Sequence, residues 1–542
     1  MAILSYTAFS GVAPKLTPRR LPPPMAQTAL NVNLESRTLK PWRGLLDTET
    51  GLTESDPSTI YRFGLDLVSD TQYWFHFLDD VDLVKGPLVA DQTERTFYTG
   101  DGAPKWTNNT LALTGGPPYP QDYRDLGVPA PSSAPTVSVT GTGSGTEDSR
   151  TYVYTNVTAY GEESAPSPAS SEVTVSASGH TVTITDFSAA PTGTSSTTAR
   201  RIYRSVTGSS GVTNYYFVKE LAVAITSTTD DAGDAIGEPI ETTDWSVPPT
   251  DMFGLTAMAN GILVGFSGND VCVSVAYVPY AWPVAYRLST DYPIVGGKAI
   301  GNQTVVLTTG SPYLLTGTAP ESMSLTKLEW PQSCVSKRSI VNVGGAVVFA
   351  SPDGLCAIDG TGALVNLTEG LFSRDDWQAL NPESMHAYLH NNRYIGFYDT
   401  GAITGGFVFE PRQGDAAFSF IDTYATAGFA DLLQDELFLK VGTKIQKWNA
   451  DGVLDTYTWT SGVTGLERPE NFGAAVVYAE GYPVTFRLYA DGNLVHTETV
   501  TSSSPFRLPG GYKAADYEVE FEGSEVIYEA HVGPTMDSLR NV

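Results

Sequence analysis

The sequence is poor in cysteine and has no long hydrophobic run. Its three cysteines, Cys272, Cys334 and Cys356, are odd in number and their spacing fits no zinc template, so we expect buried thiols rather than a disulfide framework. No run approaches the roughly 18 apolar residues of a membrane-spanning helix. No basic segment precedes the short apolar start, so we expect no signal peptide. These observations predict a soluble protein made in the cytoplasm, with no membrane-spanning segment.

Positive charge is also scarce. The chain has 32 Lys and Arg against 60 Asp and Glu, which gives a net charge of −28. A groove that grips nucleic acid normally carries a basic stripe, so this composition argues against a DNA-gripping role. It leaves open a surface that DNA passes without adhering, because an acidic wall repels phosphates within a Debye length of about 8 Å.

Glycine and proline are abundant instead, with 52 and 35 residues, and the apolar segments are rich in Val, Thr, Tyr and Phe. This composition is typical of a turn-dense β protein. A short apolar strand, a turn and a second apolar strand recur at a period near forty residues, which is typical of a β-propeller. Five such units begin at Asn260, Gly301, Gly344, Asn391 and Gln434. We therefore expect a mainly β fold with a β-propeller-like platform.

Composition shifts divide the chain further. The strand and turn TYVYTNVTAYGEES (151–164) and the hairpin ARRIYRSVTGSSGVTNYYFVKEL (199–221) resemble a fibronectin type III β-sandwich. Proline-rich stretches bound this segment on both sides. We predict an arm at 1–57, a first platform segment at 58–131, a fibronectin type III-like insert at 132–248, platform repeats at 249–465 and a small C-terminal β domain at 466–542. In the last part, an Asp491-Gly492 pair predicts a hairpin turn.

The first 57 residues predict an extended arm, because their prolines forbid a long helix. Its weak helical candidate is MAQTALNVNLES (25–36). The arm is locally basic in an acidic protein, which leaves two alternatives: a solvated tail with scattered charge, or an arm that docks on a neighbouring subunit. The candidate partner-docking residues are Lys15, Arg19, Arg20, Arg37, Lys40 and Arg43.

Two motifs partly match a metal site or a phosphate-binding loop, but each lacks a feature that such a site requires. His386 and His390 occur as H-A-Y-L-H, which lacks the glutamate of the zinc motif H-E-x-x-H, so we expect two neighbours on one face of a strand. The glycine run at Gly141, Gly143 and Gly145 follows a linker and precedes no helical pattern, so we expect no phosphate loop. We predict no cofactor, no metal site and no catalytic residues.

Two acidic motifs have plain structural explanations. Asp353-Gly354 in SPDGLCAID partly resembles the Asp-box turn of sialidase propellers, but a hairpin turn explains it. Asp79, Asp80 and Asp82 form a cluster with the chemistry to bind a cation, and solvated turn carboxylates are the plainer interpretation. Glycoside hydrolysis needs two carboxylates at a fixed separation, and the sequence singles out no such pair.

The opening residues 9–44 contain Gly11 and Pro14, Arg19 to Pro22, Ala29 to Val32 and Leu39 to Gly44. In this they resemble the tail nozzle, or tail tubular protein B-like, family of short-tailed phages. Later stretches that carry it are 277–288, 309–323, 332–341, 350–358, 468–492 and 505–512. The chain departs from the best-known nozzles in being shorter and in carrying the insert.

The resemblance implies a virion structural protein of the phage tail, not an enzyme. It implies a ring of six copies below the portal and adaptor proteins, which extends the channel for double-stranded DNA and anchors tail fibres or tip proteins. The rival interpretation is a carbohydrate-binding or glycan-hydrolysing β-propeller with an accessory fibronectin-like module. Nine tryptophans suit sugar platforms, but we expect Trp245, Trp282 and Trp448 to be core anchors.

Overall fold

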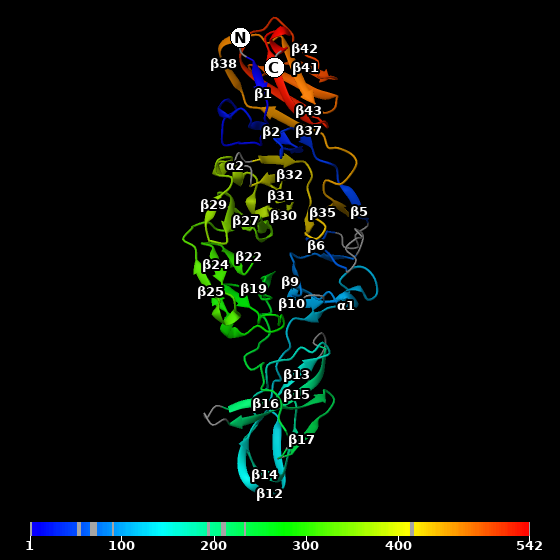
Figure 1. Cartoon of the computed structure of the whole chain (residues 1–542), viewed down its shortest axis with the longest axis vertical. Coiled ribbons are helices and arrows are strands. Elements are labelled where there is room, and N and C mark those ends of the chain that lie inside the picture. The colour runs from blue at the N-terminus through cyan, green and yellow to red at the C-terminus, as the bar shows by residue number, and fades with distance from the viewer. Residues whose placement is uncertain are drawn as a thin grey trace.

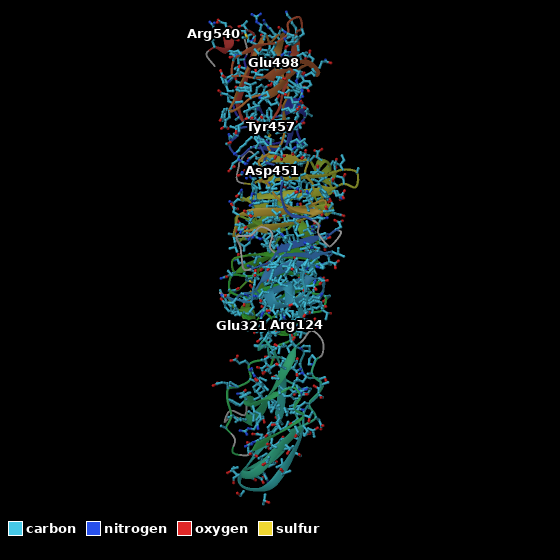
Figure 2. The ribbon with its side chains drawn as sticks, turned by 90° about the vertical axis from the view of Figure 1, so that its right-hand side faces the viewer. Arg124, Glu321, Asp451, Tyr457, Glu498 and Arg540 are labelled. Carbon is cyan, nitrogen blue, oxygen red and sulfur yellow. The ribbon has the colours of Figure 1, made fainter. Side chains whose placement is uncertain are left out.

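The computed structural model describes residues 3–50, 56–64, 73–88, 91–191, 196–207, 213–231, 233, 235–411 and 417–540. The molecule is elongated, with a C-terminal unit at one end, a group of small sheets in the middle and the insert at the other end (Figure 1). Figure 2 shows the same division from the side, with Glu321 and Arg124 at the edge of the middle part nearest the insert. The fold is mainly β, as predicted. Among the described residues, α-helix is confined to α1 (Asn109–Leu113) and α2 (Arg374–Gln378).

The middle part consists of small antiparallel sheets, in which each strand pairs with the one before it. The first two sheets are β6 (Thr59–Arg62) with β7 (Trp74–Phe77), and β8 (Asp82–Lys85), β9 (Thr96–Gly100), β10 (Gly102–Thr107) and β11 (Arg124–Asp125). After the insert come β18 (Phe253–Ala257), β19 (Leu263–Ser267), β20 (Asp270–Val273) and β21 (Leu288–Ser289), and then β22 (Ile294–Ile300), β23 (Gln303–Thr308), β24 (Tyr313–Thr316) and β25 (Ser324–Lys327).

Three further sheets complete the middle part. They contain β26 (Val341–Val343), β27 (Ala346–Ser351), β28 (Gly354–Asp359) and β29 (Leu364–Asn366); β30 (His386–His390), β31 (Arg393–Asp399), β32 (Thr404–Glu410) and β33 (Ala417–Ile421); and β34 (Ala427–Asp431), β35 (Glu436–Val441) and β36 (Lys444–Lys447). The first strand of each small sheet contacts the first strand of the next sheet along the chain. The contacting pairs are β8 and β18, β18 and β22, β22 and β26, β26 and β30, β30 and β34, and finally β34 and β6. Side chains of β6, β7 and β9 share one hydrophobic cluster. The described first strands therefore surround a common centre.

All five predicted hairpins are present, as β19–β20, β23–β24, β27–β28, β31–β32 and β35–β36. In most of these strands the middle residues are buried on both faces, which explains why they are nearly continuous apolar runs; β36 is more polar, and Ile445 is the buried residue of its four. Turn residues set the register between neighbours. Asn391 and Asn392, with φ of 50° and 57°, make the two-residue turn between β30 and β31, because asparagine tolerates the left-handed region that such turns require.

The N-terminal segment forms strands that pair with later strands of the same chain. β1 (Leu4–Tyr6) pairs with β44, and β3 (Val32–Asn33) pairs with β4 (Lys40–Pro41). β5 (Leu46–Thr50) pairs with β36 as the fourth strand of the last middle sheet. The weak helical candidate is wrong: it contains strand β2 (Ala26–Leu30), whose backbone pairs with β37 on one side and bridges to β33 on the other.

The C-terminal unit packs two sheets together. One is β1, β44 (Ile527–Gly533), β39 (Ala474–Ala479) and β42 (Phe506–Arg507). The other runs from β2 through β37 (Tyr457–Ser461), β43 (Ala514–Gly523), β40 (Val484–Ala490) and β41 (Asn493–Val500), with β38 (Thr464–Glu470) also paired to β43. Through β2 and β33 it is continuous with β30–β33, so these strands form one 10-stranded sheet that joins the middle part to the C-terminal unit. The predicted turn lies between β40 and β41, with φ of 45° at Asp491 and 76° at Gly492. β37 lies within 249–465 but pairs with this unit.

The insert contains two three-stranded sheets. They are β12 (Thr136–Arg150), β14 (Val173–Thr185) and β17 (Ser227–Asp231), and β13 (Tyr152–Thr158), β15 (Thr197–Thr207) and β16 (Thr213–Ala222). Tyr152, Val182 and Ile202 from the two sheets pack into one core. The predicted glycine run lies in β12 and not in a phosphate loop. A Cβ at Gly141 would lie 2.2 Å from the Gly179 carbonyl oxygen, so this pair of backbones meets too closely for a side chain.

No helix in the described ranges has both the length and the apolar character needed to cross a bilayer.

Candidate functional site

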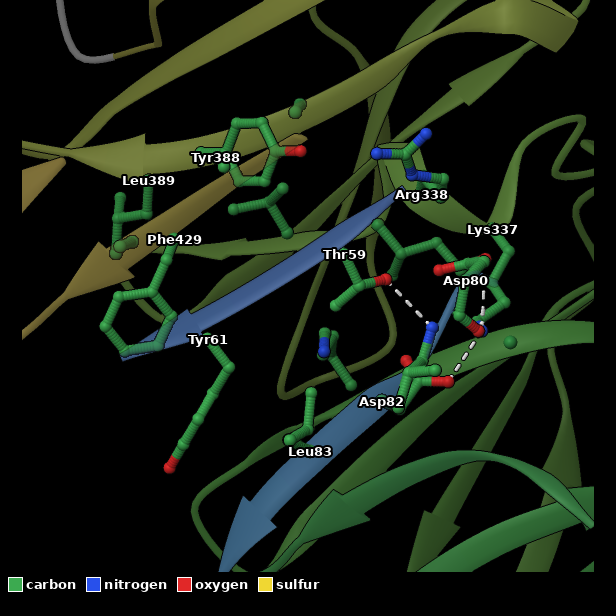
Figure 3. Close-up of a pocket in the computed structure, with 18 of the residues that line it drawn as sticks. Thr59, Tyr61, Asp80, Asp82, Leu83, Lys337, Arg338, Tyr388, Leu389 and Phe429 are labelled. Atoms are coloured by element: carbon green, nitrogen blue, oxygen red, sulfur yellow. Dashed lines mark hydrogen bonds and ion pairs between the residues drawn. The ribbon is translucent and has the colours of Figure 1, made fainter. Parts of the chain in front are cut away.

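A cavity of about 380 Å³ lies at the centre of the middle sheets. Its lining comes from residues in or next to the first strands β6, β8, β18, β22, β26, β30 and β34. These segments are separated by long stretches of sequence, so only the arrangement of whole sheets brings them together. Figure 3 shows Asp80, Asp82 and Lys337 on one side of this cavity and Arg338 and Tyr388 on another.

Lys337 is the central charge on the first side. Its Nζ lies 2.6 Å from Asp82 Oδ2 and 3.1 Å from Asp80 Oδ2, and its side chain is only 20% exposed. Burial alone lowers the pKa of Lys337, but the two carboxylates outweigh this effect and raise the pKa. Asp82 also accepts a hydrogen bond from the Gly254 N–H at 3.1 Å. This ion-pair cluster therefore ties together β8, β18 and the short 3₁₀ turn that carries Lys337.

Arg338, the next residue, spans another part of the centre. Its Nη2 donates to the carbonyl oxygens of Ser58 at 2.8 Å and Thr426 at 2.7 Å, which precede β6 and β34. Two consecutive basic residues thus link the first strands of four sheets. The centre of the molecule is fixed by side-chain contacts as well as by sheet packing.

The acidic cluster predicted from the sequence has a specific role in this arrangement. The cation that Asp80 and Asp82 bind is the chain's own Lys337. Asp79 is exposed and contributes its carbonyl oxygen, which accepts from Thr59 Oγ1 at 2.9 Å. Sequence reasoning missed Lys337, because nothing near it in the chain signals a carboxylate partner 257 residues away.

The two histidines lie in strand β30, as predicted. His386 is buried and its Nε2 lies 2.8 Å from the Ala425 carbonyl oxygen. Burial, followed by the charge of Arg338, lowers the pKa of His386 to about 4, so the imidazole is neutral at pH 7. His390 lies beside Asn391, whose side-chain amide contacts Nε2 at 3.1 Å. In the part of the chain that the structure describes, no cluster of His, Cys, Asp and Glu has the makeup of a metal site.

The predicted SPDG turn joins β27 to β28, and Asp353 pairs with Arg374 at 2.5 Å. All three cysteines are buried and free, as predicted. Trp282 and Trp448 are buried core residues, also as predicted. Trp245 differs: it is half-buried and meets Tyr280 edge to face across 5.6 Å.

The six basic residues of the N-terminal segment are spread along its path. Lys15 Nζ donates to the Glu369 carbonyl oxygen at 2.6 Å, and Arg19 pairs with Asp516 at 2.9 Å. Arg20 and Arg37 are exposed. The structure brings Lys40 and Arg43 together, where both line a cleft of about 220 Å³ beside Glu480 and Glu525. Docking of these residues on a neighbouring subunit stays a prediction.

No family model and no curated protein matches the chain. Solved structures align with parts of it at low similarity. The extracellular domain of a hybrid two-component system from B. thetaiotaomicron is 11% identical at a TM-score of 0.28, covering 46% of this chain and 38% of that one. The N-terminal domain of Nup159 is 12% identical at a TM-score of 0.23, covering 49% of this chain and 88% of that one. A chain of the mitotic checkpoint complex is 8% identical at a TM-score of 0.25, covering 68% of this chain and 92% of that one. The chain spans less than half of the first of these proteins, and TM-scores this low carry no argument.

Proposed function

We propose that this chain is a non-catalytic structural protein of a short-tailed phage tail, in which the middle sheets form a β-propeller platform. The sequence resemblance to tail nozzle proteins motivates the assignment to the tail. The arrangement of first strands around one cavity supports a propeller, and so does β5, an N-terminal strand that completes the last sheet. The two packed sheets of the insert are compatible with a fibronectin type III-like module.

The observation that carries the structural role is the Lys337 cluster at the centre. A binding or catalytic centre usually presents groups that are free to act on a ligand. Here Lys337 is held by two carboxylates, and Arg338 by two carbonyl oxygens. These charges serve to lock sheets together, which suits a part that must stay rigid during genome ejection.

The small size of the cavity supports a DNA path outside the centre of a single copy. A volume of about 380 Å³ holds roughly a dozen water molecules. Double-stranded DNA has no route through this centre, so a channel requires several copies around a common axis. We infer a ring, of six copies by the family resemblance, with the portal and adaptor above and fibres or tip proteins attached outside. The net charge of −28 per copy suits a wall that DNA passes without adhering.

Sedimentation velocity on the purified chain tests this proposal. The expected result is a discrete closed oligomer whose mass does not grow further with concentration. A monomer at every concentration, together with cleavage or retention of glycans by the same sample, would favour the rival carbohydrate-active interpretation.

A further inference from the structure

A second cavity, of about 600 Å³, lies between the insert and the middle sheets. Its walls come from β15 and β16, from the return segment 237–245 and from Tyr280 of the middle part. We propose that this cavity is a binding site for an organic cation, an alkylammonium or guanidinium group. This inference goes beyond the structural role proposed above and does not depend on it.

One side of the cavity is already neutralised by the chain itself. Arg201 Nη1 lies 2.6 Å from Glu163 Oε2, and its Nε lies 2.9 Å from Glu220 Oε2. The Tyr203 hydroxyl and Thr155 Oγ1 donate to the other oxygen of Glu163 at 2.6 and 2.7 Å. Two carboxylates therefore neutralise the charge of Arg201, so this side of the cavity does not favour an anion.

The opposite side carries negative charge without a counterion. Glu238 and Glu241 line the cavity, are exposed, and make no ion pair within the described part of the chain. The lining contains four glutamates against one arginine, so the cavity has an excess of negative charge. A ligand that enters it gains most if it brings a positive group to these two carboxylates.

Aromatic rings supply the rest of the recognition. Trp245 and Tyr280 meet edge to face at 5.6 Å and 76°, and Tyr203 and Phe217 meet at 5.9 Å and 72°. All four line the cavity. Aromatic faces beside carboxylates are the arrangement with which proteins recognise organic cations, because the negative face of each ring attracts the charge.

The volume lies within the range of about 300–1,000 Å³ that is usual for small-molecule sites, and such sites favour interfaces between domains. It has room for a polyamine or for the side chain of a lysine or arginine from another polypeptide. Both sources present the same cationic group, so the experiment separates them by the probe.

Isothermal titration calorimetry on the full chain tests the site with three probes: spermidine, Nα-acetyl-lysine methylamide, and the same lysine amide with its side chain acetylated and therefore neutral. We expect both cations to bind and the neutral probe not to bind. Glu238→Gln combined with Glu241→Gln should weaken cation binding about tenfold. Glu172→Gln, at an exposed glutamate of the insert away from the cavity, is the matched control and should leave binding unchanged.

Tighter binding of spermidine would identify free polyamines as the source, and equal or tighter binding of the lysine probe would identify a partner's basic side chain. The proposal is overturned if neither cation binds up to about 10 mM, if the double variant binds as well as the unaltered chain, or if the neutral probe binds equally. Because Glu238 and Glu241 are exposed, the double variant should keep its unfolding midpoint, and a circular dichroism melt checks this.

Discussion

Removing the charge of Lys337 should destabilise the middle sheets far more than removing the charge of a surface lysine. Breaking a fully buried ion pair costs about 3–5 kcal/mol, because a carboxylate is left buried without a counterion. Lys337 is 20% exposed and Asp82 is 15% exposed, so solvent screens part of this cost. We expect Lys337→Met to lower the free energy of unfolding by about 2 kcal/mol.

Lys327 provides the matched control. Its Nζ lies 2.5 Å from Asp291, but the two side chains are 42% and 65% exposed. Lys327→Met should therefore cost clearly less stability than Lys337→Met. Urea unfolding followed by tryptophan fluorescence measures both variants under the same conditions. A loss of stability for Lys337→Met that is no greater than the loss for Lys327→Met would contradict this prediction.

Two further measurements separate the charge from the packing of Lys337. Replacing Asp80 and Asp82 by Asn in the Lys337→Met background should recover part of the loss, because the uncompensated carboxylates are then gone. The pKa of Lys337 is raised in the folded protein, so its stabilisation is fully present below the ordinary lysine pKa and is lost only as the pH rises through the raised value. The difference between the unaltered chain and Lys337→Met should thus be constant near neutral pH and shrink only in strong alkali.

Three other changes have clear expected outcomes. Burial raises the pKa of Glu162 to about 7 despite Arg95 at 3.1 Å, so the folded chain holds a proton that the unfolded chain releases. The free energy of unfolding should therefore fall by up to about 3 kcal/mol between pH 4.5 and pH 7. Glu162→Gln should flatten this slope in pH-dependent melts, and an equal slope in both proteins would contradict the assignment. Ala29→Pro removes an N–H from β2, which lies between β33 and β37, and should lower the free energy of unfolding by at least about 2 kcal/mol and expose the C-terminal unit to limited proteolysis. An unchanged digestion pattern would argue against β2 as the link. Burial raises the pKa of all three thiols, to about 11 or 12. A thiol reagent at pH 8 should therefore label no cysteine in the folded chain and three in urea. Rapid labelling of one cysteine in the folded chain would contradict this prediction, because it would show that this thiol is accessible.

The features that could be predicted from the sequence are local ones. Each of the five hairpins is two apolar strands and a turn within a short segment, and the pattern of apolar residues and turn residues is enough to locate it. The Asp491-Gly492 turn and the burial of the cysteines are of the same kind. Fourth strands such as β29 and β21 are short and only partly buried, and the repeat alone does not define them.

The features that could not be predicted depend on pairing over long distances. β2 looked weakly helical because Ala26, Ala29 and Leu30 fit one helical face, but its backbone is used by strands that lie hundreds of residues later. Nothing in the sequence of β5 indicates that it pairs with β36, which lies about four hundred residues later in the chain. The acidic cluster at Asp80 and Asp82 was visible, but its partner Lys337 was not, because its position is set by the closure of the sheets rather than by neighbouring residues.

Imaging of the purified protein by cryo-electron microscopy tests most directly whether copies of this chain, rather than the centre of one copy, form a channel. We expect closed rings with an open hole between subunits, while the centre of each subunit keeps only its small cavity, of about 380 Å³, beside the Lys337 cluster. Separate monomers, or particles in which an open passage runs through the middle sheets of a single chain, would contradict it.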